Sequence, residues 1–331
     1  MPPPAIFLSF AESARAHYYR DGAVAGLRAL GDVLLNETGE VLDSKALIEA
    51  AKGCQVIVCD RATRGDAALF AHSPDLAIFM RCAVDVRNID IDAASAHGVL
   101  VTHASAGFAN AVAEWVLGMM FDLSRNLSTA VLTYRAGQTP EVRMGRELRG
   151  AALGVLGYGA IGRRLCDSAL ALGMHVAVSD PHAVVADPRI AQQPIDELLD
   201  SADYLVCLVP ATPETANLMN DARFAQMKPG AFFINAARGE VVDDDPLLRA
   251  LDSGRIAGCA LDVGRAADQM PAPRLAAHPR VLATPHTGGL TPEAVDHQAN
   301  ETVAQLELLL QGRVPAGALN IAAATRLARI R

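Results

Sequence analysis

Short apolar runs alternate with segments of helical periodicity over the first hundred residues. The apolar runs have the length and β-branched content of buried strands, and they fall at Ala5–Phe10, Val33–Asn36, Gln55–Cys59, Leu76–Met80 and Val99–Thr102. Between them the apolar positions recur at helical spacing, at Glu12–Leu30, Ser44–Lys52, Arg64–Ala71 and Asp90–His97. This alternation predicts a parallel sheet covered by helices.

A second α/β pattern begins at Ala151. Its expected strands are Leu153–Leu156, His175–Ser179, Tyr204–Val209, Phe232–Asn235, Gly258–Asp262 and Val281–Thr284. We therefore predict six parallel strands joined by crossover helices. The last helical segment, Pro292–Leu310, follows these strands and has no evident place against them.

A long apolar helix is predicted between the two patterns, at Asn110–Leu127, followed by a polar connector at 135–150. Packing in a core would explain the composition of this helix. Exposure of the large side chains on its neighbouring turns would also suit a contact between subunits, and these are Trp115, Met119, Met120 and Phe121.

Composition narrows the class of protein. A chain of 331 residues suggests about two domains, and 51% hydrophobic residues are ample for their cores. The net charge of -8 argues against nucleic acid or an anionic membrane as partner, and the short apolar runs predict neither a membrane span nor a signal peptide. Six cysteines without a C-x-x-C pair indicate buried thiols in a reducing, cytoplasmic setting, and nine histidines without ligand spacing predict no metal site.

The strand expected at Leu153–Leu156 runs into a G-x-G-x-x-G turn. Gly157 would allow the tight turn, Gly159 would let the backbone approach a pyrophosphate, and Gly162 would let the next helix pack close to the strand. The amides at the start of that helix favour a diphosphate. This turn predicts a dinucleotide site.

Asp180 ends the next expected strand, about 20 residues after the glycines. A carboxylate there accepts hydrogen bonds from two free ribose hydroxyls and repels a 2′-phosphate, so it favours NAD over NADP. The alternative is a solvated aspartate that merely ends a strand.

Two candidates for chemistry lie just after expected strands, Arg238 in Phe232–Glu240 and His286 in Val281–Gly289. Dehydrogenation of an alcohol needs a group that moves a proton and a cation that holds a carboxylate or polarises a carbonyl. Ligands of doubly wound sheets bind at the carboxyl ends of strands, where both residues are expected. His286 lies between Pro285 and Thr287-Gly288, where packing offers no reason for an imidazole.

Several motifs in one order resemble the D-isomer-specific 2-hydroxyacid dehydrogenases. The similar stretches lie between Ile78 and Gly289, at Arg81–Asp90, Ala111–Glu114, Gly157–Gly162, Pro210–Thr215, Asn235–Gly239, Ala260–Val263 and Thr284–His286. The resemblance implies two Rossmann-like, doubly wound α/β domains with the active site in the cleft between them. Residues 1–103 and 290–331 would form a flavodoxin-like substrate domain, and 104–289 an NAD domain with a dimerisation region at 110–150. It further implies a homodimeric, NAD-dependent enzyme acting on a small 2-hydroxy or 2-keto acid.

The same resemblance implies roles for individual residues. Arg238 would orient the substrate's carboxylate and carbonyl, and His286 would donate the proton in ketoacid reduction and accept it in hydroxyacid oxidation. Asp262 would hold the nicotinamide amide, and Val84, Asp85 and Phe108 would join Arg238 around the substrate. The expected contacts to NAD are Gly157, Gly159, Ala160, Ile161, Gly162, Asp180, Val209, Pro210, Ala236, Ala237, Arg238, Asp262, His286 and Gly289.

The sequence departs from the family at its third catalytic residue, because Ala267 occupies the position of the expected glutamate. Either Asp268 or Gln269 would then orient His286. We favour Gln269, since Pro271-Ala272-Pro273 follows it as in the similar formate dehydrogenases. A glutamine would orient the imidazole without raising its pKa, whereas an aspartate would favour the protonated form.

Other departures lie in the substrate loops. Asp85 replaces a glycine and would disfavour a dianionic substrate if it pointed inward, Phe108 replaces a frequent asparagine, and Trp115 replaces a histidine. Arg61 and Arg64 are candidate contacts for a second anion, although a solvated loop explains them better.

Two alternatives to this dehydrogenase stay open: a formate dehydrogenase-like enzyme, and an NAD-sensing scaffold that has lost catalysis.

Overall fold

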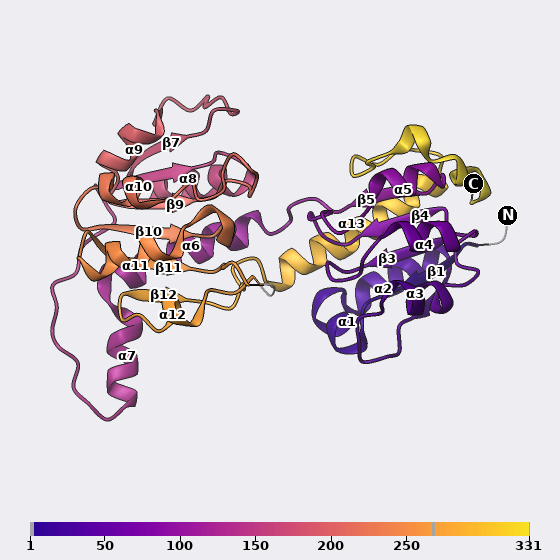
Figure 1. The fold of residues 1–331 in the computed structure, drawn as a ribbon, viewed down its shortest axis with the longest axis horizontal. Coiled ribbons are helices and arrows are strands. Elements are labelled where there is room, and N and C mark those ends of the chain that lie inside the picture. The colour runs from indigo at the N-terminus through magenta and orange to yellow at the C-terminus, as the bar shows by residue number, and fades with distance from the viewer. Residues whose placement is uncertain (1–2, 267–268, 331) are drawn as a thin grey trace. The chain divides into compact units, whose positions relative to one another are not determined.

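The computed structural model describes residues 3–266 and 269–330, so Ala267 and Asp268 lie outside the described residues. The chain divides into two compact units, one formed by 1–107 with 291–331 and the other by 108–290. The chain passes between them at Gly107/Phe108 and at Leu290/Thr291. Figure 1 shows both units.

Unit 1 is built on a five-stranded parallel sheet in the order β2-β1-β3-β4-β5. The strands are β1 (Ala5–Leu8), β2 (Asp32–Leu35), β3 (Val56–Cys59), β4 (Ile78–Arg81) and β5 (Leu100–His103). Its helices are α1 (Glu12–Tyr18), α2 (Arg20–Leu30), α3 (Ser44–Ala50), α4 (Ala67–His72), α5 (Ile91–Ala96) and α13 (Pro292–Leu310), with 3-10 turns at Ile321–Ala323 and Thr325–Arg329.

Successive residues of these strands enter different cores, because side chains alternate across a sheet. Ile6 and Leu8 of β1 pack with α2 and α13, whereas Phe7 packs on the face covered by α3, α4 and α5. The helix Pro292–Leu310, which had no evident place in the sequence, thus covers one face of unit 1 and packs on α2.

The single helix predicted at Glu12–Leu30 is wrong, since the structure has two. The first helix ends at Tyr18, and Arg20, which begins the second, has a left-handed backbone with φ of 63°. The break buries Tyr19 completely, and its hydroxyl lies 2.8 Å from Thr302 Oγ1 on α13. Burial of an aromatic ring with a satisfied hydroxyl outweighs local helix periodicity here.

Unit 2 is a seven-stranded, all-parallel sheet in the order β12-β11-β10-β9-β6-β7-β8. The strands are β6 (Ala152–Leu156), β7 (His175–Ser179), β8 (Ile190–Gln192), β9 (Tyr204–Cys207), β10 (Ala231–Asn235), β11 (Ile256–Leu261) and β12 (Val281–Ala283). The predicted number of six was wrong because β8 has only three residues, of which only Ile190 is buried. The helices are α6 (Ala109–Arg125), α7 (Leu127–Arg135), α8 (Ala160–Ala171), α9 (Ile195–Ser201), α10 (Asp221–Gln226), α11 (Asp244–Asp252) and α12 (Pro273–Ala276), with a 3-10 turn at Gly239–Val241.

The strand order reverses direction between β6 and β9, which is the switch point of a doubly wound fold. Helices α6 and α8 pack on one face of this sheet, and α9, α10 and α11 on the other. Two parallel α/β units therefore confirm the predicted fold class.

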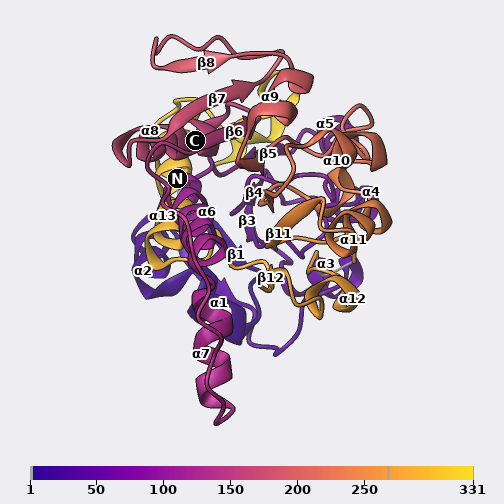
Figure 2. The same ribbon diagram turned by 90° about the vertical axis from the view of Figure 1, so that its left-hand side faces the viewer.

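Helix α6 ends at Asn126, whose backbone is left-handed with φ of 55°, and α7 follows as a separate helix. Helix α7 has no buried residue and projects from the sheet of its unit, as both views show (Figures 1 and 2). Of the four large side chains expected on the outside of α6, Met120 is fully buried, which corrects its expected exposure, and Phe121 is exposed.

All six cysteines are buried and none forms a disulfide, as expected. Burial raises the pKa of every one of these thiols. Within the described residues, no helix is both long enough and apolar enough to cross a membrane, and no cluster of three or more His, Cys, Asp or Glu side chains could hold a metal ion.

Candidate active site

The glycine turn lies at the switch point of the unit 2 sheet, between the ends of β6 and β9. Gly157 has φ of 97°, and a Cβ there would lie 3.0 Å from the carbonyl carbon of Leu208. A Cβ at Gly162 would lie 2.4 Å from the carbonyl oxygen of Gly157. Only glycine fits both positions, because one requires a left-handed backbone and the other a close approach of helix to turn.

Gly159 begins helix α8 and supplies no side-chain cap, and nothing lies within 4 Å of where its Cβ would be. The first amides of this twelve-residue helix, including those of Ala160 and Ile161, have no acceptor within the helix, and no side chain caps them. Such a helix start binds phosphate groups. The turn thus fits the pyrophosphate of a dinucleotide.

Asp180 follows β7, next to the glycine turn. Its carboxylate accepts hydrogen bonds from the backbone amides of Tyr158 at 2.7 Å and His182 at 2.8 Å. Burial alone would raise the pKa of Asp180, but these backbone hydrogen bonds outweigh it and bring the pKa below its ordinary value. The ionised carboxylate keeps lone pairs for a ribose.

Arg238 leaves the carboxyl end of β10 in a loop held by Asn235. The buried side chain of Asn235 accepts a hydrogen bond from the amide of Ala237 at Oδ1. Its Nδ2 donates one to the carbonyl of Arg238, and both distances are 3.0 Å. The half-buried guanidinium of Arg238 donates to the carbonyl of Ala237 at 2.7 Å. Sequence reasoning missed the role of Asn235, although a polar residue at the end of a buried apolar strand was a usable signal.

His286 lies in the loop after β12, and Asp262 at the end of β11 holds that loop. The buried carboxylate of Asp262 accepts from Thr284 Oγ1 at 2.6 Å and from the amides of Thr287 and Gly288, each at 2.8 Å. His286 itself is half-buried, with a left-handed backbone at φ of 55°. The three hydrogen bonds leave Asp262 capacity for one more donor, since a carboxylate accepts about four.

Gln269 lies in a loop that closes on itself. Its backbone carbonyl accepts a hydrogen bond from the backbone amide of Gly264. Its backbone amide donates one to the carbonyl of Ala266, and both distances are 2.8 Å. Among the described residues its side-chain Oε1 is buried and has no hydrogen-bond partner. An unsatisfied buried acceptor is costly unless a donor reaches it. Asp268, the other candidate partner of His286, lies outside the described residues.

The remaining expected contacts fall in both units. Val209 and Pro210 follow β9, and Ala236 and Ala237 follow β10, so all four lie at the same edge of the unit 2 sheet as the glycine turn. Phe108 lies at the start of α6. A Cβ on Gly289 would lie 3.1 Å from the Cβ of Phe108.

Val84 and Asp85 lie in unit 1, after β4. The carboxylate of Asp85 forms an ion pair with Arg87 at 2.8 Å and also accepts from Arg87 Nε and the Arg87 amide. Arg87 therefore offsets part of the negative charge that Asp85 brings to this loop.

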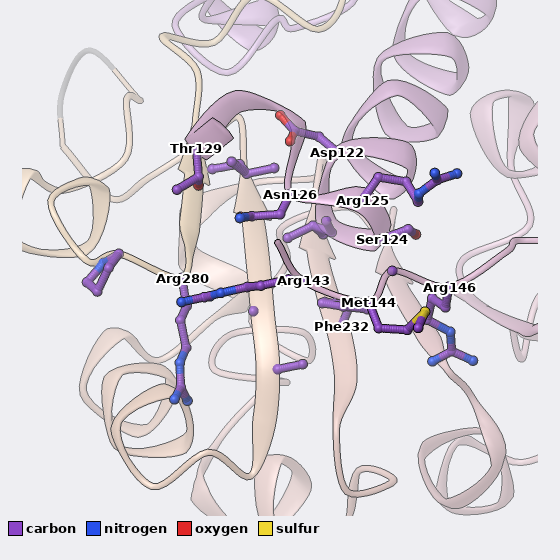
Figure 3. A pocket seen from close by; sticks show the side chains of 16 residues that line it. Asp122, Ser124, Arg125, Asn126, Thr129, Arg143, Met144, Arg146, Phe232 and Arg280 are labelled. Carbon is purple, nitrogen blue, oxygen red and sulfur yellow. The ribbon is translucent and has the colours of Figure 1, made fainter. Parts of the chain in front are cut away.

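A cavity of about 330 Å³ lies at the amino ends of β10, β11 and β12 (Figure 3). Phe232, Gly258 and Arg280 line it together with the end of α6 and residues 143–146. Arg238 and His286 follow the carboxyl ends of the same strands. The cavity therefore contains none of the candidate catalytic residues.

A glycine turn at a switch point, an acidic residue after the next strand and an open helix start define a dinucleotide-binding protein. Comparison with known proteins narrows this class. Residues 117–288 match the family described as "D-isomer specific 2-hydroxyacid dehydrogenase, NAD binding domain". D-3-phosphoglycerate dehydrogenase of Rattus norvegicus is 34% identical over 289 residues, which are 86% of this chain and 54% of that protein.

Solved structures of the same fold cover nearly the whole chain. A putative D-isomer specific 2-hydroxyacid dehydrogenase from a Polaromonas species superposes with a TM-score of 0.87 at 25% identity, covering 96% of this chain and 100% of that one. D-lactate dehydrogenase of Aquifex aeolicus, complexed with NAD and lactic acid, gives 0.77 at 27% identity over 96% and 99%. The chain belongs to the D-isomer-specific 2-hydroxyacid dehydrogenase family, and its cofactor is NAD. It spans about half the length of the curated relatives it matches.

Proposed function

We propose that the protein is an NAD-dependent dehydrogenase that interconverts a small 2-keto acid and its D-2-hydroxy acid. One observation carries the proposal: Arg238 and His286 follow β10 and β12 at the carboxyl edge of one sheet, and Asp262 on the intervening β11 fixes the histidine's loop. A cation and an acid–base group at this edge are what the reaction requires.

When bound, NADH supplies the hydride for the substrate's carbonyl carbon. Arg238 binds the carboxylate and polarises the carbonyl, and protonated His286 donates a proton to the carbonyl oxygen as the alcohol forms. In the reverse direction neutral His286 accepts that proton. Asp180 holds the adenosine ribose, and the backbone at Gly159, Ala160 and Ile161 holds the pyrophosphate.

Gln269 would orient His286 in place of the family's glutamate. Its buried Oε1 lacks a donor among the described residues, and an imidazole N–H would satisfy it. The backbone of Val84 and Asp85 in unit 1 would also contact the substrate's carboxylate.

We further propose a homodimer through α7. Exposed apolar side chains line this projecting helix and the connector behind it: Leu127, Val131, Leu132, Tyr134, Val142 and Met144. Apolar exposure of this extent marks an interaction surface, and a second copy of the chain is the simplest occupant. The unpaired, buried cysteines also suit a reducing cytoplasm.

A panel of 2-keto acids with NADH tests the activity, with formate and NAD as a separate arm. Turnover of at least one keto acid, lost in His286→Ala while NADH still binds, is the expected result. Binding of NADH without turnover of any acid would instead support the NAD-sensing scaffold, which the alanine at position 267 makes a specific alternative. Turnover of formate alone would support the hypothesis of a formate dehydrogenase-like enzyme.

A further inference from the structure

The guanidinium of Arg81, at the end of β4, is fully buried in unit 1. It donates to the carbonyl of Asp60, to the carbonyl of Thr63 at 2.9 Å and to Asn88 Oδ1 at 2.7 Å. All three acceptors are uncharged oxygens, and no ion pair of Arg81 occurs within the described residues. Its Nε is buried and has no hydrogen-bond partner in the same part of the chain.

These acceptors belong to two loops that follow neighbouring strands. Asp60 and Thr63 lie after β3, whereas Asn88 lies in the loop after β4 that also carries Val84 and Asp85. Asn88 strengthens the connection, because its Nδ2 donates to the carbonyl of Arg61 at 3.0 Å. Arg81 and Asn88 therefore brace one loop against the other.

Backbone hydrogen bonds complete this brace. Gly65 N donates to the carbonyl of Asn88 at 3.1 Å, and Asp90 N donates to the carbonyl of Gly65 at 2.7 Å. The contact between the loops is tight, since a Cβ on Gly65 would lie 3.1 Å from the side chain of Ile89. The two loops thus form one connected element at the carboxyl edge of the sheet.

A buried cation without a carboxylate partner is a poor way to stabilise a fold. Desolvation of the charge is costly, and apolar residues of similar volume are often equally stabilising or better. The forked guanidinium is suited instead to holding several carbonyls at fixed positions, because its donors have a rigid geometry. The buried guanidinium also places a positive charge close to the loops that it holds.

We propose that Arg81 is a positioning residue for the substrate's carboxylate, acting through the loop that contains Val84 and Asp85. This inference rests on the proposed function, because that function places the carboxylate at the backbone of this loop. The brace fixes the backbone that receives the carboxylate, and the buried charge adds to its affinity for an anion.

The first test compares Arg81→Met, which keeps volume and removes the fork, with Arg81→Lys, which keeps the charge. The KM for the keto acid should rise about 10- to 100-fold in Arg81→Met, while kcat and the NADH dissociation constant change by less than about threefold. Arg81→Lys should recover part of the KM. An unchanged KM, or a loss of NADH affinity equal to the rise in KM, would overturn the proposal.

Arg326→Met is the matched control. Arg326 also donates to backbone carbonyls, those of Ser73 and Leu76, but it does so before β4, at the opposite edge of the same sheet. This variant should leave the KM unchanged. If both variants raise the KM alike, the effect is one of general stability and the proposal is wrong.

Hydrogen exchange tests the brace without any activity. Arg81→Met, or Asn88→Ala if the former does not fold, should speed exchange of the amides of Gly65 and Asp90 and leave unit 2 unchanged. Unaltered exchange at both amides would overturn the brace. If the unmodified protein turns over no acid, the proposed function fails, and the exchange result still decides whether Arg81 holds the two loops.

Discussion

The carboxylate of Asp262 lies 2.8 Å from the backbone nitrogen of Gly288, two residues after His286. It also accepts from the amide of Thr287 and from the hydroxyl of Thr284, so residues on both sides of the histidine are held by one side chain. A Cβ on Gly288 would lie 2.8 Å from the same carboxylate, so the loop tolerates no bulk there. Asp262 thereby fixes the left-handed backbone that presents His286.

Asp262→Asn should lower kcat about 10- to 100-fold, because the amide nitrogen cannot accept the hydrogen bonds that hold the loop. The NADH dissociation constant should change less, and steady-state kinetics with a binding titration separates the two effects. Asp203→Asn is the control. Asp203 accepts a hydrogen bond from the amide of Ala152 and forms an ion pair with Lys228, and it lies at the amino edge of the sheet, opposite to the site. It should lower the thermal midpoint and leave kcat intact. A dominant loss of NADH affinity in Asp262→Asn would favour the nicotinamide amide as its main partner.

NADH should bind far better than NADPH, and Asp180→Ala should narrow this preference by about 10- to 100-fold, the range expected when charge-assisted hydrogen bonds and repulsion of a phosphate are removed. Fluorescence titration with both cofactors measures it. Equal affinity of the unmodified protein for both cofactors would contradict the assignment.

The preference for NADH should persist in mildly acidic solution. The pKa of Asp180 is lowered because backbone hydrogen bonds outweigh its desolvation, so the carboxylate stays ionised at pH 5. A depressed pKa also means that its stabilising contribution is complete above the unfolded value of about 3.9 and is lost as pH falls through the folded value. A preference that disappears between pH 7 and 5 would show that another group controls it.

His286→Ala should lower turnover about 10²- to 10⁴-fold, the usual contribution of general acid–base catalysis, with little change in NAD binding. The comparison requires saturating keto acid and a direct measurement of NADH affinity. His278→Ala is a suitable control, because His278 contacts Asp252 and lies before β12 at the other edge of the sheet. A His286→Ala variant that keeps most of its activity would mean that the proton comes from another group.

The pH dependence identifies the partner of His286. With neutral Gln269 as partner, kcat/KM for ketoacid reduction should fall as pH rises through about 6–7, since the reaction needs the protonated imidazole and an amide adds no charge. Gln269→Ala should lower the rate, and Asp268→Ala should not. A fall at higher pH that moves down in Asp268→Ala, beside a fully active Gln269→Ala, would assign the role to Asp268.

Leu132→Asp should convert the proposed dimer to a monomer, because it puts a charge on an apolar face of α7 where Leu132 is 63% exposed. Light scattering after gel filtration measures the mass. Val184→Asp, at an 83% exposed position after β7, is the matched control and should leave the mass unchanged. A monomeric unmodified protein would refute the dimer directly.

Local sequence patterns were sufficient to predict the two sheets and the glycine turn, since both depend on residues that are neighbours in the sequence. The apolar runs at Val56–Cys59 and Ile78–Arg81 are fully buried strands, and Gly157 has the positive φ that its turn requires. The short edge strand β8 escaped detection because one buried residue does not create a pattern. The division of Glu12–Leu30 escaped because its cause, the contact of Tyr19 with Thr302, lies 283 residues away.

Long-range contacts also explain what the sequence could not say about the site. The expected role of Asp262 concerned a cofactor, whereas the structure shows its carboxylate holding the loop of His286. The ion pair of Asp85 with Arg87 depends on the conformation of their loop, which the sequence pattern does not give. Arg81 and Asn88 lie in a recognisable motif, but their partners after β3 are fixed only in three dimensions.

The place of α13 bears on the order in which the chain acquires its structure during synthesis. Ala299, Leu306 and Leu309 of this helix fill one core of unit 1, so that face of the sheet stays bare until the ribosome has passed residue 309. Unit 2 is continuous in sequence, from 108 to 290, and meets no such delay. We therefore expect the middle of the nascent chain to fold first and the amino-terminal hundred residues to need chaperone protection, since exposed apolar strands aggregate.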